Sequence, residues 1–267
     1  MSDPESRGRI IRFWYPGDPD NRIVKHGVTT GGDYFIGYVD ETTVLKFPHF
    51  KGKAQSMEDL QVERQIYERV GKHPRIIEYK GWHEDGLLLE YAPNKSLNCF
   101  LADNPTLSKR ERLRIAKETA EGVDFVHKNN VLLRDIAVRN ILLDADLHVK
   151  LCDLTGQLLG DDGQVIAKGH GWEDFDAMKP RADTQYADIV TDIFALGTTV
   201  YKIMVNQGPF PDTHDDQELK QRFEQRRFPE LDERLGGKVV WGCWDSLYKS
   251  AGDVAKDLEK LEQASLE

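Results

Sequence analysis

The sequence predicts an α+β protein of two lobes, in which a small antiparallel sheet with one helix precedes a larger, mainly helical part. Short runs of β-forming residues separated by turn residues dominate up to Tyr91, and apolar residues at helical spacing dominate afterwards. Pro93, Asn94 and Ser96 interrupt the pattern between the two parts. The expected division is an N-terminal extension at 1–22, a small lobe at 23–91 and a large lobe at 92–267.

The small lobe is predicted to contain several short strands and one helix. VTTGGDYFIGYVDETTVLKFP, residues 28–48, is typical of two or three strands joined by tight turns. SMEDLQVERQIYERVG, residues 56–71, has apolar residues at helical spacing and a capping-box pattern at Ser56 and Asp59, which predicts a helix beginning there. HPRIIEYKGWHEDGLLLEYAP, residues 73–93, then predicts two more strands.

The large lobe is predicted to consist mainly of helices. A second capping-box pattern, at Ser108 and Glu111, begins a helix whose one face continues to His127. Two short pieces of strand and loop follow, and residues 161–183 have loop character. Residues 188–206 carry the apolar pattern of a long helix, and at least one more helix is expected near the C-terminus.

Composition excludes several classes of protein. The chain has 267 residues, 39% of them hydrophobic, and its formal net charge of -10 argues against nucleic-acid binding as the main function. No apolar run approaches the roughly 20 residues of a membrane span, and the polar start lacks the apolar stretch of a signal peptide. Three cysteines without CxxC spacing indicate neither disulfides nor zinc. We expect an intracellular protein, cytoplasmic or nuclear, of undetermined oligomeric state.

VLLRDIAVRNILLD, residues 131–144, combines apolar positions with charged and amide side chains. An ordinary core strand would not hold such side chains, because burying them unpaired costs free energy. The polar residues of this segment are therefore expected to face a bound ligand.

Four segments in order along the chain resemble the motifs of the protein kinase family. TVLKFP resembles the strand that carries the nucleotide-binding lysine, here Lys46, and VERQIYERVG resembles the helix whose glutamate, here Glu63, pairs with it. LRDIAVRN resembles the catalytic loop HRDLxxxN, with Asp135 and Asn140. VKLCDLTG resembles the segment that carries DFG, with Asp153.

This resemblance implies a two-lobed protein-kinase-like fold that binds ATP and Mg²⁺ between its lobes and phosphorylates a protein substrate. Lys46, held by Glu63, would contact the α and β phosphates of ATP. Asp135 would accept the proton of the substrate hydroxyl or orient that hydroxyl. Asn140 and Asp153 would supply the hard oxygen ligands that Mg²⁺ prefers.

The resemblance covers roughly residues 24–262 and includes further positions. Asp192 in TDIFALG resembles the helix aspartate that holds the backbone of the catalytic loop. The connection between the lobes would bind adenine through backbone groups, with one apolar side chain behind the base, and a glycine turn would lie near the phosphates. The residues that the resemblance assigns to these contacts are Gly31, Gly32, Leu89, Glu90 and Ala92.

Four departures from the family pattern leave an alternative function open. The glycine turn lacks a clean GxGxxG, Leu133 replaces the histidine of HRD, Thr155 replaces the glycine of DFG, and Arg181 replaces the glutamate of Ala-Pro-Glu. The alternative is a pseudokinase that serves as a nucleotide-binding or interaction scaffold, although the retained catalytic residues argue against it. A second rival, a small-molecule phosphotransferase of this broad fold, would be expected to carry a dedicated insertion, and none is obvious.

Substrate class is ambiguous in the sequence. Arg139 resembles the arginine that tyrosine kinases place four residues after the catalytic aspartate, and Ala137 stands where Ser/Thr kinases place a lysine. Lys179-Pro180-Arg181 does not resemble the docking platform of tyrosine kinases. Ser/Thr substrates are therefore slightly favoured over Tyr substrates.

The segment between Gly156 and Arg181 contains no Ser, Thr or Tyr, so it offers no acceptor for an activating phosphate. We hypothesise that one of its carboxylates pairs with Arg134 in place of a phosphate. A solvated acidic loop is an equally good interpretation. The candidate carboxylates are Asp161, Asp162, Glu173, Asp174 and Asp176.

Overall fold

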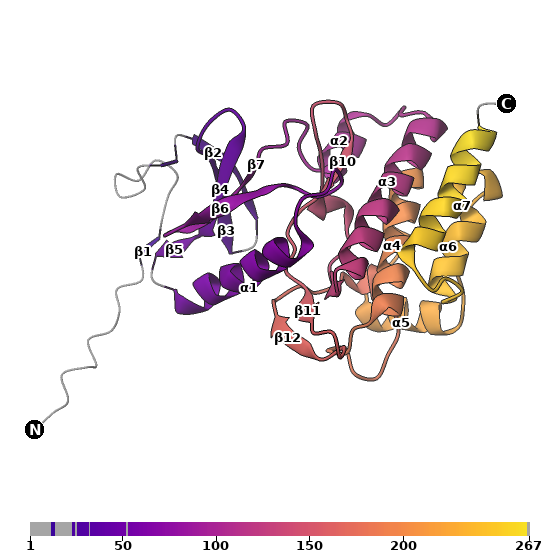
Figure 1. Ribbon diagram of the computed structural model, residues 1–267. Coiled ribbons are helices and arrows are strands. Elements are labelled where there is room, and N and C mark those ends of the chain that lie inside the picture. Colours follow the sequence, from indigo (N-terminus) through magenta and orange to yellow (C-terminus); the bar gives the residue numbers. More distant parts are fainter. Residues whose placement is uncertain (1–11, 14–22, 25, 32, 52, 266–267) are drawn as a thin grey trace, which may run out of the picture.

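The computed structural model has two lobes (Figure 1) and describes residues 12–13, 23–24, 26–31, 33–51 and 53–265. A sheet with one helix forms the N-terminal lobe, and helices make up most of the C-terminal lobe. The predicted two-lobed α+β class is confirmed. Apart from β1 (Arg12–Phe13), the predicted N-terminal extension lies outside the described residues, as does Gly32.

The small lobe is built on a five-stranded antiparallel sheet in the order β2-β3-β4-β7-β6. All six residues of the central strand, β4, are buried, so a charged side chain on it needs partners inside the protein. A separate short pair, β1 and β5, precedes the helix. The strands are β2 (His26–Gly31), β3 (Tyr34–Tyr38), β4 (Thr43–Pro48), β5 (Phe50–Lys51), β6 (Tyr79–His83) and β7 (Gly86–Glu90).

The helix of the small lobe is α1 (Ala54–Val70), and the capping box predicted for it is wrong. Its N-cap is Lys53, which makes no side-chain cap, and Ser56 lies within the first turn as a buried residue. The Ser56 carbonyl oxygen accepts a hydrogen bond from the Tyr34 hydroxyl at 3.3 Å, so the backbone of this turn is bound to β3. Tertiary packing has therefore overridden the local capping preference.

The large lobe is organised around α4 (Ile189–Val205), whose side chains are buried along almost its whole length. The helix α3 (Lys109–Lys128) packs against α4 and α7, and α6 packs against α4. The predicted capping box at Ser108 and Glu111 is confirmed. The other helices are α2 (Leu97–Asp103), α5 (Asp216–Glu224), α6 (Gly237–Trp244) and α7 (Ala251–Ala264). In the described part of the chain, no helix has the length and apolar character to cross a bilayer.

Short strands and 3₁₀ turns lie between α3 and α4. The prediction of a plain loop at 161–183 is wrong in part, because β12 pairs with β11 and a 3₁₀ turn follows. Strand β11 also pairs with β8. These elements are β8 (Val131–Leu132), η1 (Val138–Asn140), β9 (Ile141–Leu143), β10 (Val149–Leu151), β11 (Gln157–Leu159), β12 (Val165–Lys168) and η2 (Phe175–Ala177).

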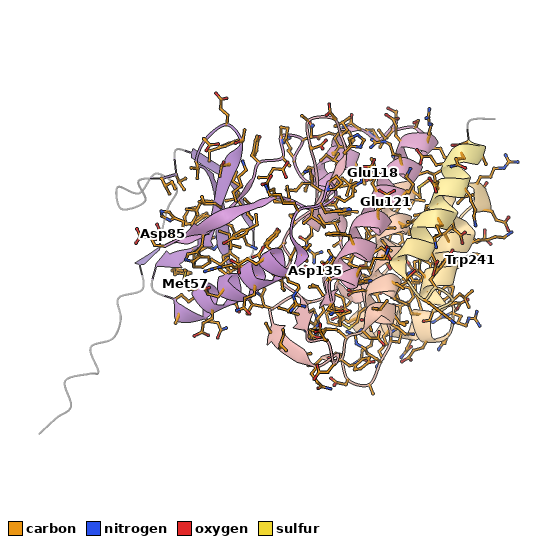
Figure 2. The ribbon with its side chains drawn as sticks, in the orientation of Figure 1. Met57, Asp85, Glu118, Glu121, Asp135 and Trp241 are labelled. Carbon is orange, nitrogen blue, oxygen red and sulfur yellow. The ribbon has the colours of Figure 1, made fainter. Side chains whose placement is uncertain are left out.

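The loop between α1 and β6 fixes the small lobe to α3. The rings of His73 and Phe125 stack with centroids 4.0 Å apart. Arg75 donates to Glu121 at 3.1 Å and lies 3.2 Å from a carboxylate oxygen of Glu118. Figure 2 labels Glu118 and Glu121 on α3. The helix α1 is therefore held beside the large lobe, which places its buried face near the residues between β8 and β11.

Candidate active site

The central strand β4 brings Lys46 to a cluster of opposite charges. The Lys46 ammonium donates to Glu63 Oε2 of α1 at 2.6 Å and also to Asp153 Oδ1, which follows β10. Its nitrogen lies 5.0 Å from the centroid of the Tyr34 ring, which adds a cation–π contact. Lys46 and Glu63 are buried, whereas the Asp153 side chain is 36% exposed. Lys46, Glu63 and Asp153 are called the nucleotide cluster below.

The charges of the nucleotide cluster favour the ionised forms of Lys46 and Asp153. Burial disfavours the ammonium, but the carboxylates of Asp153 and Glu63 outweigh that effect and raise the pKa of Lys46 above its ordinary value. Burial likewise favours protonated Asp153, but the charge of Lys46 prevails and lowers the pKa of that carboxyl. Burial raises the pKa of Glu63 despite the ammonium beside it. The Lys46 ammonium thus contacts the carboxylates of both Glu63 and Asp153.

The catalytic-loop residues lie next to one another on the segment after β8. Asn140 Nδ2 donates to Asp135 Oδ2 at 2.9 Å and to the Asp135 carbonyl at 3.1 Å, while Asp135 Oδ1 pairs with Arg139. Figure 2 shows Asp135 in the region where the lobes meet. Burial raises the pKa of Asp135 to about 6, against the opposing effects of Arg139 and Asn140. A carboxylate in this range can accept a proton near neutral pH.

Asp192 holds the backbone of this loop, as the sequence predicted. Its Oδ2 accepts the Leu133 N–H at 2.7 Å and its Oδ1 accepts the Arg134 N–H at 2.9 Å. His127 Nε2 lies 2.9 Å from Asp192 Oδ2, a contact that the sequence did not indicate because His127 falls on the packed face of α3. A lone histidine in the last turn of the helix was the available signal.

Two non-glycine residues of the site have left-handed backbones. Arg134 and Asp153 both have φ of +59°, a conformation that costs roughly 1–3 kcal/mol in a non-glycine residue. Thr155, in the place of the family's glycine, fits because its N–H donates to the Asp153 carbonyl at 2.8 Å. The close approach that requires glycine occurs one residue later, since a Cβ on Gly156 would lie 1.8 Å from the Leu132 carbonyl oxygen.

The connection between the lobes follows β7. Leu89 is buried opposite Val44 of β4. Glu90 Oε2 accepts from Lys150 Nζ and from the Glu78 N–H, each at 3.0 Å, and the Glu90 N–H donates to the Glu78 carbonyl oxygen at 2.9 Å, so this residue is bound within the protein. Ala92 is buried two residues further on. Gly31 ends β2, but the turn after it is incompletely described because Gly32 lies outside the described residues.

A second buried cluster, called the activation cluster below, consists of Arg134, Glu173 and Arg181. Glu173 Oε2 accepts from Arg181 Nη2 at 2.6 Å, and its charge also acts on Arg134. The hypothesised carboxylate is thus Glu173, but its ion pair is with Arg181 and not directly with Arg134. Among the described residues, Arg134 Nε and Nη2 have no hydrogen-bond partner. Burial raises the pKa of Glu173, against the opposing charge of Arg181.

The other acidic residues of the segment have different partners. Asp174 pairs with Arg139, and Asp176 pairs with Lys202 at 2.8 Å. Asp161 accepts a long hydrogen bond of 3.5 Å from Asn130, and Asp162 accepts the Gln164 N–H at 3.0 Å. The sequence could not distinguish these carboxylates, because their partners come from distant parts of the chain.

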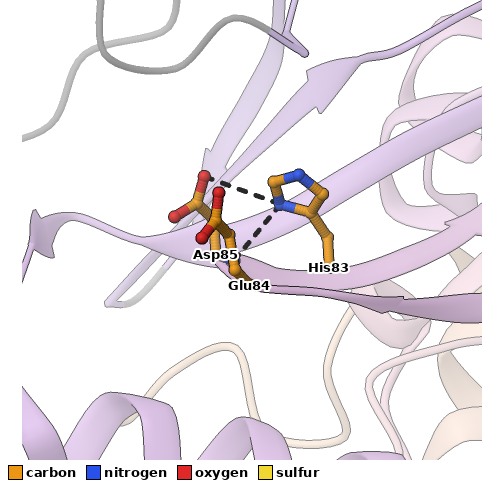
Figure 3. A group of neighbouring side chains, drawn as sticks. All are labelled: His83, Glu84 and Asp85. Carbon is orange, nitrogen blue, oxygen red and sulfur yellow. Dashed lines mark hydrogen bonds and ion pairs between the residues drawn. The ribbon is translucent and has the colours of Figure 1, made fainter.

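One further group of potential metal ligands lies far from this site, in the turn between β6 and β7. Figure 3 shows His83, Glu84 and Asp85 side by side. The Asp85 N–H donates to His83 Nδ1 at 3.2 Å, and an Asp85 carboxylate oxygen lies 3.5 Å from the same nitrogen. Since these residues are consecutive and Nδ1 already accepts a hydrogen bond, their proximity follows from the turn and does not indicate a metal site.

Comparison with known proteins agrees with this geometry. A family model described as "Protein kinase domain" matches residues 40–264. The chain is 27% identical to the carbon catabolite-derepressing protein kinase of Saccharomyces cerevisiae over 177 residues, which are 64% of this chain and 28% of that protein. It is 28% identical to the serine/threonine-protein kinase TIO of Arabidopsis thaliana over 179 residues, 65% of this chain and 13% of that protein. The match spans less than a third of either relative. By its sequence and its fold, the chain belongs to the protein kinase domain family.

Proposed function

We propose that the chain is an ATP-dependent protein kinase that uses Mg²⁺ and phosphorylates a protein hydroxyl. The observation that carries this proposal is the nucleotide cluster, in which a buried ammonium from β4 contacts one carboxylate from α1 and one from the segment after β10. Such a cluster costs desolvation energy that a purely structural protein would not need to incur. Its exposed member, Asp153, can face an incoming ligand.

The side chains present fit the metal and the nucleotide. Asn140 uses its amide nitrogen on Asp135, which leaves its carbonyl oxygen as a possible ligand atom, and Asp153 uses one carboxylate oxygen on Lys46. Both residues thus offer hard oxygen donors of the kind that Mg²⁺ prefers. When bound, Mg²⁺ would neutralise charge on the phosphates.

The remaining roles follow from position and charge. Lys46, kept in place by Glu63, would bind the phosphates of ATP. Asp135 would orient the substrate hydroxyl and take its proton as the hydroxyl oxygen bonds to the γ-phosphorus and ADP leaves. Asp192 keeps the backbone beneath Asp135 in place. The backbone of Glu90 and Ala92, with Leu89 behind the base, would bind adenine.

Ser/Thr substrates remain slightly favoured over Tyr. The relative from Arabidopsis is by its printed name a serine/threonine-protein kinase, which supports this choice. Arg139 resembles the tyrosine-kinase pattern, and its contact with Asp135 fits a role near the substrate hydroxyl in either class. A cytoplasmic or nuclear location stays a prediction.

A nucleotide-binding pseudokinase is the alternative function. It would have the same fold but would not transfer phosphate. The proximity of Asn140 to Asp135 and of Asp153 to Lys46 argues against it, because a scaffold gains nothing from keeping a proton acceptor beside potential metal ligands. The kinase names of the relatives also favour catalysis.

Transfer of radiolabel from ATP to a panel of protein substrates tests the proposal. The wild-type chain should label a substrate, and Asp135→Asn should lower kcat by roughly 10²–10⁴-fold, the usual contribution of a general base. Asp146→Asn is the matched control, because Asp146 is exposed in the turn between β9 and β10. Equal transfer by wild type and Asp135→Asn, or none by wild type with any substrate, would refute the proposed activity.

A further inference from the structure

Two consecutive acidic residues of the segment before α4 lie near opposite sides of the catalytic loop. Glu173 is buried, whereas the Asp174 side chain is 42% exposed. Each interacts with an arginine that flanks Asp135 in the sequence: Glu173 lies beside Arg134, and Asp174 pairs with Arg139. Asp174 therefore contacts the chain directly on one side of the proposed catalytic residue, and Glu173 lies near the chain on the other side.

The outer contact is a bridge through Arg139. Its Nη1 donates to Asp174 Oδ2 and its Nη2 donates to Asp135 Oδ1. A guanidinium shared by two carboxylates has a fixed plane, because each pair uses a different nitrogen. The position of Arg139 against Asp135 therefore depends on where Asp174 lies.

The inner contact ties the segment to the base of the catalytic loop. Glu173 pairs with Arg181 near the end of the segment, and it shares its charge with Arg134. The Arg134 backbone N–H is held by Asp192 of α4, and its guanidinium lies 5.9 Å from the ring of Trp172, the residue before Glu173. The side chains of Arg134 and Glu173 are almost fully buried, so screening by solvent is weak there.

No residue between Gly156 and Arg181 can accept a phosphate on a hydroxyl. A segment of this kind that depends on phosphorylation would need such an acceptor to bring negative charge to an arginine. Here the Glu173 carboxylate can take the place of such a phosphate near Arg134, and Arg181 is its ion-pair partner.

We propose that Glu173 and Asp174 are positioning residues that fix residues 156–181 against the catalytic loop, so that the kinase works without phosphorylation of this segment. The inference rests on the proposed kinase activity and adds its regulation. Arg139 and Asp135 act at the reaction itself, and Glu173 and Asp174 act through them. The substrate site is then formed as soon as the chain folds.

The test compares wild type, Glu173→Gln and Asp174→Asn, all treated with a protein phosphatase and then freed of it. Treated wild type should keep its kcat. Each variant should lose roughly ten- to a hundredfold in kcat, the expected effect of misplacing a catalytic group by about 1 Å. The KM for ATP should change by less than about twofold, because the nucleotide cluster is intact. Asp174→Glu, which keeps the charge, should recover part of the loss.

Asp161→Asn is the matched control, because it removes the same charge from the same segment at a residue whose only described partner is Asn130. The melting shift with MgATP shows whether each variant is folded. If Glu173→Gln does not fold, the kcat of Asp174→Asn decides the test, because the Asp174 side chain is 42% exposed and its replacement should not prevent folding.

Loss of wild-type activity after phosphatase treatment would overturn the inference, and so would wild-type kcat in Asp174→Asn. Both outcomes presuppose an active wild type and leave the proposed function standing. An untreated wild type that transfers no label would instead refute the proposed function.

Discussion

The nucleotide cluster and the activation cluster both bury opposite charges, but they balance them differently. In the nucleotide cluster one ammonium contacts two carboxylates, and one of these, Asp153, is 36% exposed. In the activation cluster two guanidinium groups surround one carboxylate, and the buried carboxylate of Asp192 lies next to Arg134. The first therefore has an excess of negative charge that is partly open to solvent, whereas the second keeps its charges inside the protein, with Arg134 Nε and Nη2 unpaired among the described residues.

This difference separates a site with a partly exposed carboxylate from a site whose ion pair is enclosed in the protein. An excess carboxylate beside a possible phosphate-binding lysine suits a metal ion that arrives with its nucleotide. A cluster of buried ions fixes the backbone around it. The nucleotide cluster, in the region that follows the family pattern, is thus partly exposed. The activation cluster, in the region that departs from that pattern at Arg181, is enclosed in the protein.

The largest expected effect comes from breaking the nucleotide cluster with Lys46→Met. Two carboxylates then face each other without a cation, and unfolding in urea should show a loss of about 3–5 kcal/mol, the cost of removing one partner of a buried ion pair. Phosphate transfer should also be lost, because nothing then binds the phosphates. Lys95→Met is the control, since that lysine is exposed. A stable Lys46→Met variant would show that the cluster is not a buried ion network.

A smaller effect is expected from Arg181→Met, which opens the activation cluster. Glu173 loses its direct partner while remaining buried, and the free energy of unfolding should fall by about 3 kcal/mol. The melting shift with MgATP should persist, because the nucleotide cluster is untouched. The double variant Arg181→Met/Glu173→Gln should recover part of the stability, since no uncompensated carboxylate remains. A double variant less stable than the single one would contradict a closed ionic cluster.

A pH comparison sharpens the contrast further. Burial raises the pKa of Glu173 above the ordinary glutamate range, so this group favours the folded state at pH values below its unfolded pKa, roughly 4.3, and loses that contribution as pH rises through the folded pKa. Gln at this position does not titrate. Urea midpoints at pH 5 and pH 7.5 should therefore show that the stability of wild type, taken relative to Glu173→Gln, is lower at the higher pH. The opposite trend would mean that the Arg181 charge outweighs burial.

The smallest effect is expected outside both clusters, at Lys150→Met. The pair of Lys150 with Glu90 is partly exposed, and pairs of this kind contribute at most about 1 kcal/mol. ATP binding should not change, because only the backbone of Glu90 is proposed to contact adenine. A clear loss of the MgATP melting shift in this variant would show that the Glu90 side chain takes part in nucleotide binding.

Elements fixed by local pattern were predictable from the sequence. The capping box of α3 and the apolar periodicity of α4 act within a few residues, and both appear where the sequence indicated. The start of α1 was not predictable. Ser56 is buried and its carbonyl oxygen accepts a hydrogen bond from Tyr34 of β3, a contact with no local sequence pattern. Strand β12 was missed because its partner β11 gives no local signal for the pairing.

The candidate site also has a part that was predictable from the sequence and a part that was not. Motif order was enough to expect that Lys46, Glu63 and Asp153 would meet, and the structure brings them together. The choice of Glu173 among several acidic residues depended on which one is buried, and burial is a property of the folded chain. The pairing of Arg139 with Asp174 could not be predicted either. The two residues are 35 positions apart in the chain, and the sequence has no pattern that indicates such a contact.

The contrast between an open and a closed cluster is tested most directly by thermal unfolding with ATP, with and without Mg²⁺. At about a hundred times its Kd, ATP with Mg²⁺ should stabilise the wild type by about 2.7 kcal/mol and raise Tm by several degrees. ATP alone should give a smaller rise, and Asp153→Asn should lose the difference that Mg²⁺ makes. An identical Tm for wild type with and without MgATP would contradict a nucleotide cluster open to its ligand.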